Sequence, residues 1–345
     1  MAVSRRVYSI CCGFGLVLLS CVKDKPEPKK AVLSDPEPLK RVFVVNEGNF
    51  TSGNASISLY NSANNEVQED YFKTINNTSL GDVAQSMAYI NEHYYLVVNN
   101  SGKIVVCDKA FKMKTNITGL VSPRYILQVS ATKAYVSDYK SGYVSVLDLS
   151  NHTVSRTIGL PGWTEEMVLL QNKVYVCNVS KDYLYVINPV SDEVEDSVWV
   201  GIHTSGIQLD KNGKLWVLSS GDFVSSAAQL SLINPNTLDV EKSFVFPAIR
   251  QPFKLAMNGR RDSLYFMDKD IFVMPVSAVS LPDVALIKAG SGTFYGLGIH
   301  PLSSEVYLSD ALDYVQRSHI SVYAANGTKK AEFKAGINAN GFYFE

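Results

Sequence analysis

A short pattern that returns about every 40 residues is the feature that most constrains the fold of this chain. In each copy an aromatic residue of a β-rich run is followed by two mostly apolar positions and then by Asn, Asp or Ser. The copies are Phe43–Asn46, Tyr135–Asp138, Tyr175–Asn178, Trp216–Ser219, Tyr265–Asp268 and Tyr307–Asp310, with a seventh, Leu96–Asn99, that has Leu in the aromatic position. Such units bury their apolar faces only by stacking on neighbours. Seven of them predict an all-β fold, a seven-bladed β-propeller.

Each repeat divides into four strands, which are clearest at residues 126–129, 133–138, 143–149 and 154–158. The chain has no amphipathic pattern long enough for a helix of three turns, which disfavours helical and βαβ folds. The first repeat lacks its innermost strand and opens at residue 41 with the second. Residues 340–344 follow the last repeat, so we expect this C-terminal strand to pair beside residues 41–46 and close the first blade.

The N-terminus predicts a lipoprotein signal peptide over residues 1–20. Arg5 and Arg6 precede an apolar run, Val7–Leu19, that is too short to cross a bilayer. Leu18–Cys21 resembles a bacterial lipobox, which implies cleavage before Cys21 and lipidation of that residue. Residues 21–40, rich in Lys, Pro and Glu, are then an acylated Cys and flexible tether, and residues 41–345 the propeller. The alternative is an ordinary secretory signal with a chance Cys.

Charge and cysteine content exclude some classes of protein. Of 32 Lys and Arg residues two lie in the signal peptide, which leaves 30 against 33 Asp and Glu, a net charge of −3. Without a block of basic residues the chain is a poor nucleic-acid binder. Cys107 and Cys177 fall in blades that are not neighbours, so we expect both to be buried and unpaired, and neither forms a metal site.

The loops from second to third strands, and from fourth strands to the next blade, share one face of a propeller. They are rich in amides, hydroxyls and aromatic rings and have few charges, which suits a large, neutral ligand with amide or hydroxyl groups. The alternative is that these residues only form turns or core contacts. The ligand-binding candidates are Asn49, Phe50, Asn100, Arg124, Tyr125, Tyr139, Trp163, Phe223, Phe294, Tyr295 and Tyr314.

Catalysis has little support in the sequence. It contains no HExxH, no GxSxG, no phosphate-binding loop and no His–carboxylate cluster with metal-ligand spacing, so we predict no catalytic residue and no metal site. Only His203 falls on the loop face, and we expect it to be a turn residue rather than a ligand-binding one. Glu165 and Glu166 are adjacent, and an extended strand would direct them to opposite sides.

Several segments resemble the YncE-like β-propeller lipoproteins of Bacteroides, including the surface cobalamin-binding BtuG group. The resemblance runs from about residue 41 to the C-terminus. It rests on Val44–Phe50, Leu80–Met87, Val98–Ser101, Ser122–Ile126, Arg261–Tyr265, Met274–Val276, Glu305–Tyr307 and Asp310–Tyr314.

This resemblance implies a non-enzymatic lipoprotein of the outer membrane, anchored by lipid and exposed at the cell surface. It would bind cobalamin or a related corrinoid as a transported ligand, not as a cofactor, and deliver it to a TonB-dependent outer-membrane cobalamin transporter. Two alternatives stay open: a glycan-binding or protein-docking propeller, and a lactonase-like hydrolase.

Overall fold

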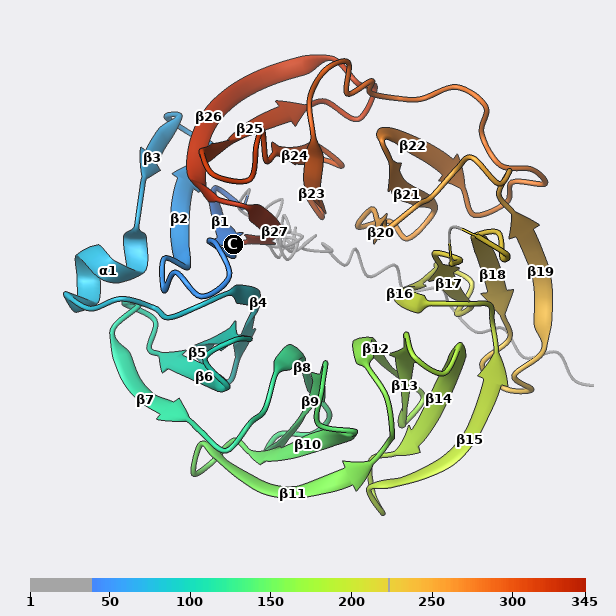
Figure 1. The fold of residues 1–345 in the computed structure, drawn as a ribbon, viewed down its shortest axis with the longest axis horizontal. Helices are drawn as coiled ribbons and strands as arrows, with labels where there is room; N and C mark the ends of the chain where they lie inside the picture. The colour runs from blue at the N-terminus through green and yellow to red at the C-terminus, as the bar shows by residue number, and fades with distance from the viewer. Residues whose placement is uncertain (1–38, 223) are drawn as a thin grey trace, which may run out of the picture. The chain divides into compact units, whose positions relative to one another are not determined.

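The computed structural model describes residues 39–222 and 224–345, which form seven antiparallel sheets arranged around a common axis (Figure 1). The predicted seven-bladed β-propeller is therefore confirmed. The predicted signal peptide, the lipidation site Cys21 and nearly all of the tether lie outside the described residues, as does Phe223. In the part of the chain that the structure describes, no helix is both long and apolar enough to cross a bilayer.

Each blade runs from an inner strand near the axis to an outer strand at the perimeter (Figure 1). The first blade comprises β27 (Ala339–Phe344), β1 (Arg41–Asn46), β2 (Ser56–Asn61) and β3 (Glu66–Gln68), followed by the short helix α1 (Tyr71–Asn76). The second comprises β4 (Ala84–Ile90), β5 (His93–Val98), β6 (Lys103–Cys107) and β7 (Met113–Ile117), and the third β8 (Pro123–Gln128), β9 (Lys133–Asp138), β10 (Tyr143–Asp148) and β11 (Thr153–Gly159).

The remaining blades follow in the same order. The fourth comprises β12 (Thr164–Leu170), β13 (Lys173–Asn178), β14 (Tyr183–Asn188) and β15 (Glu193–Trp199), and the fifth β16 (Thr204–Leu209), β17 (Leu215–Ser219), β18 (Gln229–Ile233) and β19 (Val240–Val245). The sixth comprises β20 (Lys254–Met257), β21 (Ser263–Asp268) and β22 (Asp270–Pro275), and the seventh β23 (Phe294–Ile299), β24 (Val306–Asp310), β25 (Arg317–Tyr323) and β26 (Lys329–Ile337). The sixth blade has three strands, and a bridge between Ile271 and Ile287 partly covers its outer edge.

The hydrophobic core consists of seven clusters, one between each pair of adjacent blades. The second strands carry apolar side chains on both faces, because each face packs against a different blade. Tyr175, for example, packs in the cluster shared with the fifth blade, whereas Val174 and Val176 pack toward the third. Cys107 and Cys177 are buried and unpaired, as the sequence predicted.

The structure corrects the register of the repeat in the second blade. In the third blade the first residue of the inner strand, Pro123, pairs with Asp138, and in the second blade the corresponding residue, Ala84, pairs with Val98. Val98 therefore occupies the position of Asp138. Three residues earlier, Tyr95 and not Leu96 is the structural equivalent of Tyr135. The hydroxyl of each of these tyrosines reaches the outer turn of the following blade, at His152 for Tyr95 and Asp192 for Tyr135. The sequence pattern was misplaced by one residue because Asn99, which follows the strand, imitates the polar end of the motif.

The C-terminal strand closes the ring. β27 pairs antiparallel with β1, from Val42 with Phe344 to Asn46 with Ala339, as the sequence predicted. Backbone hydrogen bonds between Arg41 and Glu345 in both directions (2.7 and 2.8 Å) hold the end of this pairing. Without β27, the edge of β1 would lack its backbone partners.

We predict that deleting residues 340–345 lowers the melting temperature by more than about 10 °C or prevents folding, because it removes the inner strand of one blade and leaves the ring open. Thermal denaturation followed by circular dichroism measures this effect. Glu345→Gln is the matched control, since it removes the charge from the partly exposed ion pair with Arg41, leaves a side-chain oxygen to accept the bond from Tyr94, and should cost less than about 1 kcal/mol. Equal melting of the truncated and full chains would contradict the closure.

Candidate functional site

A β-bulge near the start of most inner strands shapes the centre of the propeller. The pairing with the second strand skips residues after Ala84, Pro123, Thr164, Thr204, Phe294 and Ala339. The residue that follows each of these positions lines one central cavity: Gln85, Arg124, Glu165, Ser205, Tyr295 and Asn340. A bulged residue is released from the regular alternation of the strand and can be redirected. In the sixth blade, which has no such bulge, Lys254 begins the inner strand and lines the same cavity.

This upper cavity has a volume of about 470 Å³ and lies where the inner strands begin. Besides the bulged residues it is lined by Glu47, Trp163, Val179, Ser180, His203, Ser220, Phe253 and Lys254. Its walls therefore come from every blade of the ring, and its polar groups include two carboxylates and two cations.

A lower cavity of about 230 Å³ adjoins the upper one along the channel. Gln85, Lys254 and Asn340 line both, so these three side chains mark the boundary between them. Tyr125 and Glu166, the second residues of two of the bulges, line the lower cavity. Glu165 and Glu166 thus both face the channel, at two levels. Glu165 contacts Arg124 of the third blade and Glu166 accepts a bond from the Ile207 N–H of the fifth blade, so the two side chains point to opposite neighbours, as the sequence predicted.

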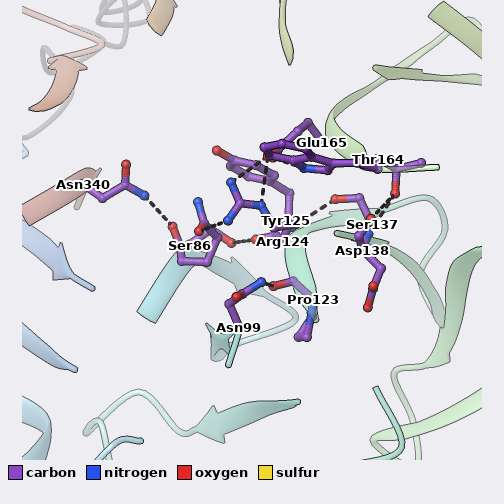
Figure 2. A network of polar contacts seen from close by, with 12 residues as sticks. Ser86, Asn99, Pro123, Arg124, Tyr125, Ser137, Asp138, Thr164, Glu165 and Asn340 are labelled. Atoms are coloured by element: carbon purple, nitrogen blue, oxygen red, sulfur yellow. Dashed lines mark hydrogen bonds and ion pairs between the residues drawn. The ribbon is translucent and has the colours of Figure 1, made fainter. Parts of the chain in front are cut away.

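Polar contacts between inner strands surround the channel, most of them between neighbouring blades and one, from Lys254 to Asn340, from the sixth blade to the first; Figure 2 shows part of this ring. Asn340 Nδ2 donates to the Gln85 carbonyl (3.1 Å), Ser86 Oγ to the Arg124 carbonyl (2.6 Å), and Arg124 to Glu165. The ring continues as the Ile207 N–H donates to Glu166 (3.1 Å), Gln208 donates to the Leu255 carbonyl (3.4 Å), and Lys254 Nζ donates to Asn340 Oδ1 (2.6 Å). These bonds fix the cavity walls in one arrangement.

The ion pair between Arg124 and Glu165 is the centre of a hydrogen-bond network in the site. Arg124 donates from Nε (2.9 Å) and Nη2 (2.6 Å) to Glu165 Oε1, and from Nη1 to Gln85. The indole N–H of Trp163 donates to the same carboxylate oxygen (2.7 Å), and the guanidinium lies 5.7 Å from the centre of the indole ring. Glu165 Oε2 is buried and accepts no hydrogen bond within the described residues.

Across the cavity, Tyr295 donates its hydroxyl hydrogen to Glu47 Oε2 (2.6 Å). Burial raises the pKa of the Glu47 carboxyl above its ordinary value, although the Tyr295 hydrogen bond and the charge of Lys254 act in the opposite direction. Burial likewise lowers the pKa of the Lys254 ammonium, which the nearby charges of Glu47, Glu166 and Glu165 partly offset. The centre of the site therefore holds several ionisable groups in a confined environment.

Aromatic pairs stand at the mouth of the upper cavity on two sides. Tyr139 and Trp163 meet edge to face with ring centres 4.6 Å apart, and Tyr314 meets Tyr295 in the same way at 5.8 Å. Tyr139 is 41% exposed and Tyr314 46% exposed, so both present ring surface to solvent. Rigid aromatic surfaces at a cavity mouth provide contact area at a low cost in conformational entropy.

The structure brings six of the eleven predicted ligand-binding residues to the channel or its mouth. Arg124, Trp163 and Tyr295 line the upper cavity, Tyr125 lines the lower one, and Tyr139 and Tyr314 stack on cavity residues.

Four of the other predicted residues lie elsewhere, and Phe223 is outside the described residues. Asn49 bonds to the Tyr314 carbonyl (2.6 Å), Asn100 bonds to Asp82 (2.5 Å), and Phe50 is exposed on its loop. These three do not line the cavity. Phe294 also does not line the cavity; it is partly buried and packs against the hydrophobic cluster between the sixth and seventh blades.

Of the four charged residues of the site, the prediction included Arg124 and missed Glu47, Glu165 and Lys254. Glu47 and Glu165 lie in or beside loops that the sequence assigned to this face, but aromatic and amide residues were preferred. Gln85 and Phe253, which belong to those preferred kinds, were also left out. Lys254 and Asn340 were missed because they belong to inner strands. The prediction of a surface with few charges fits the aromatic mouth and is wrong for the centre, where Glu47, Arg124, Glu165 and Lys254 gather.

His203 is a turn residue that also lines the cavity. Its ring nitrogen Nδ1 donates to the Gly221 carbonyl (2.7 Å), and its backbone has a φ of 58°. Over residues 39–222 and 224–345, no group of three or more His, Cys, Asp and Glu side chains is arranged to hold a metal ion.

These features define a seven-bladed β-propeller with a polar central funnel. Residues 40–345 match the family model DUF5074, described as a domain of unknown function, so the chain belongs to this family. No curated protein matches the chain.

Solved structures share the fold at low identity. A quinoprotein alcohol dehydrogenase-like protein from Bacteroides thetaiotaomicron is 15% identical, with a TM-score of 0.70 over 88% of this chain and 78% of its own. A candidate 6-phosphogluconolactonase from Bacteroides fragilis is 11% identical, with a TM-score of 0.68 over 90% of this chain and 100% of its own. A protein from Lactobacillus plantarum is 13% identical, with a TM-score of 0.67 over 89% and 99%. Similarity at this level shows the fold alone.

We predict that Arg124→Met lowers the free energy of unfolding by about 3 kcal/mol, because it leaves the buried carboxylate of Glu165 without its cation. The double variant Arg124→Met/Glu165→Gln removes that unpaired charge and should recover at least about 1 kcal/mol of the loss. Urea denaturation measures both changes. A double variant less stable than Arg124→Met would show that the pair is not coupled in this way.

Glu166 gives a prediction about pH. Burial raises the pKa of its carboxyl from 4.5 to about 7, so the folded protein disfavours the ionised form. The stability that the neutral carboxyl provides is present in full below pH 4.5 and is lost as the pH rises through about 7. Glu166→Gln stays neutral at every pH. We therefore compare the free energy of unfolding of Glu166→Gln with that of the unchanged protein. The difference between them should shift in favour of Glu166→Gln by on the order of 3 kcal/mol between about pH 4.5 and pH 8.

Chemical denaturation at a series of pH values checks this result, with Glu332→Gln as a control for an exposed carboxylate of the outer strand β26. A difference between Glu166→Gln and the unchanged protein that is the same at pH 5 and pH 8 would contradict the raised pKa.

Proposed function

We propose that this protein is a non-enzymatic binding protein that captures cobalamin or a related corrinoid on the face where the inner strands begin. The observation that carries the proposal is the funnel itself. Side chains from all blades form one cavity of about 470 Å³, and aromatic pairs flank its mouth. The sequence resemblance to cobalamin-binding propellers supports the same ligand class.

The chemistry of the funnel suits a corrinoid. The side chains of a corrinoid are mostly neutral amides, and its nucleotide loop carries one phosphate. Amides, hydroxyls, carboxylates and an ammonium in the cavity can pair with amide donors and acceptors, and the exposed rings of Tyr139 and Tyr314 can cover apolar ligand surface. A corrinoid is larger than the cavity, so it would insert one edge and rest on the aromatic mouth.

The anchor and the partner belong to the same proposal. A lipid on Cys21 would hold the propeller at the outer membrane, exposed at the cell surface, and a TonB-dependent cobalamin transporter would receive the ligand. In this proposal the transporter contacts single exposed apolar side chains on loops of this face: Phe50 in the first blade and Val224 and Ile249 in and after the fifth, which are 65%, 94% and 91% exposed. Co-purification of the transporter with the tagged protein, lost when these three residues are changed to Ser, would support this part.

Two other functions compete with this one. Exposed aromatic residues at the mouth also suit a glycan, and retention on polysaccharide gels that cobalamin does not affect would favour that function. A lactonase-like hydrolase would show turnover of lactones.

The test of the corrinoid proposal is calorimetry of the purified protein with cyanocobalamin. We predict binding, and a loss of about 2 kcal/mol or more in binding free energy for Trp163→Ala and Tyr139→Ala, as is usual for buried aromatic anchors. Trp199→Ala is the matched control, because Trp199 is 52% exposed on the outer strand β15 and should leave the affinity unchanged. No heat and no retained cobalamin at micromolar protein would refute the proposal.

A further inference from the structure

The walls of the upper cavity contain hydrogen-bonding groups that the protein does not satisfy. Glu165 places both Arg124 bonds and the Trp163 bond on Oε1, and its Oε2 is buried without a donor, while the side chain as a whole is 6% exposed. A buried acceptor without a partner is costly and calls for a physical explanation.

Glu47 has a similar spare acceptor. Tyr295 donates to its Oε2, and within the described residues no donor reaches its Oε1. Glu47 lines the same cavity as Glu165, and the two carboxyl groups are close enough for the charge of Glu165 to raise the pKa of Glu47. The cavity thus has two carboxylate oxygens that can each accept an additional hydrogen bond.

Lys254 provides hydrogen-bond donors to the same cavity. Its ammonium donates to Asn340 Oδ1 (2.6 Å), and among the described residues it makes no other hydrogen bond and no ion pair. An ammonium has three N–H groups, so donors remain for a ligand. The charges of Glu47 and Glu165 both act on Lys254, which places donor and acceptors within electrostatic range of one another.

We propose that this part of the cavity recognises a primary carboxamide of the ligand, with Glu47 and Glu165 accepting its N–H groups and Lys254 donating to its carbonyl oxygen. The assignment rests on the proposed function and specifies which group of the corrinoid enters the funnel. A primary carboxamide has two N–H donors on one atom and a carbonyl acceptor beside it, which matches two acceptors and one donor.

Charged groups match the cavity less well. A carboxylate or phosphate would place its negative charge against Glu47 and Glu165, and it would have no hydrogen to offer their oxygens. A ligand ammonium would meet Lys254 and Arg124 and would leave the spare donors of Lys254 without an acceptor. A neutral group that both donates and accepts satisfies both kinds of group, and a primary carboxamide has two N–H donors for the two carboxylates where a hydroxyl has one O–H. A site built around hydrogen bonds strongly rejects analogues that lack them.

The experiment compares cyanocobalamin with its monocarboxylic acids, in each of which one side-chain amide is hydrolysed. Calorimetry at pH 7.5 with the unchanged protein should show that at least one isomer binds about 30-fold or more weakly than cyanocobalamin, while the others bind within about threefold. In Glu165→Gln and in Glu47→Gln this discrimination against the same isomer should fall below about fivefold, because one source of repulsion is removed.

Glu332→Gln is the matched control, since it neutralises a carboxylate that is exposed on the outer strand β26 and lines neither cavity. It should keep the full discrimination. A purely structural role of Glu165 would weaken cyanocobalamin and the acid equally and leave their ratio unchanged. If Glu165→Gln does not fold, Glu47→Gln carries the test, because Gln at this position still accepts the bond from Tyr295.

Two outcomes overturn the assignment while the proposed function stands: every monocarboxylic acid binds the unchanged protein as tightly as cyanocobalamin does, or the discrimination persists in both Glu47→Gln and Glu165→Gln. If the unchanged protein does not bind cyanocobalamin at all, the corrinoid proposal fails and this assignment fails with it.

Discussion

The pairing of β27 with β1 is the interaction on which the rest of the structure depends. Each blade of a propeller is stable because it packs between two other blades. An open ring would expose one apolar face of each of its two end blades. The C-terminal strand joins the two ends of the described chain in one sheet, with Val42 opposite Phe344 and Asn46 opposite Ala339. It also places Asn340 in the channel, where this side chain bonds to Lys254 and to the Gln85 carbonyl. The same strand therefore closes the ring and completes the wall of the cavity.

The repeated bulges give the central channel its polar lining. A regular inner strand would direct alternate side chains into the two neighbouring blade interfaces. The bulge releases one or two residues from this alternation, and the released side chains face the channel at two levels, as Glu165 and Glu166 do. Because each blade contributes from a different part of the chain, groups as distant in sequence as Glu47 and Tyr295 form a hydrogen bond. The cavity can thus combine carboxylates, amides, cations and aromatic rings without disturbing the core.

The electrostatics of the funnel distinguish its centre from its mouth. The mouth presents the exposed rings of Tyr139 and Tyr314, whereas the centre confines Arg124, Glu165, Glu47 and Lys254. Only the first two of these four form an ion pair within the described residues, and the other two retain hydrogen-bonding capacity. An aromatic mouth above polar groups with open positions suits a ligand that is apolar on its face and bears amides at its edge. This arrangement is the physical basis of the corrinoid proposal.

The sequence by itself determined the blades, their number and their closure, because the repeat, the alternation and the turn residues are local signals that neighbouring units reinforce. It also predicted the face on which the cavity opens, and three of its candidate residues, Arg124, Trp163 and Tyr295, line that cavity. Only the tertiary structure decided that Tyr95 rather than Leu96 is the repeat aromatic, that Phe294 packs against a blade interface, and that Glu47, Lys254 and Asn340 share a cavity. The reason is that a bulge changes the direction of a side chain without changing the composition of its strand, and that the cavity arises only when strands from distant blades meet around one axis.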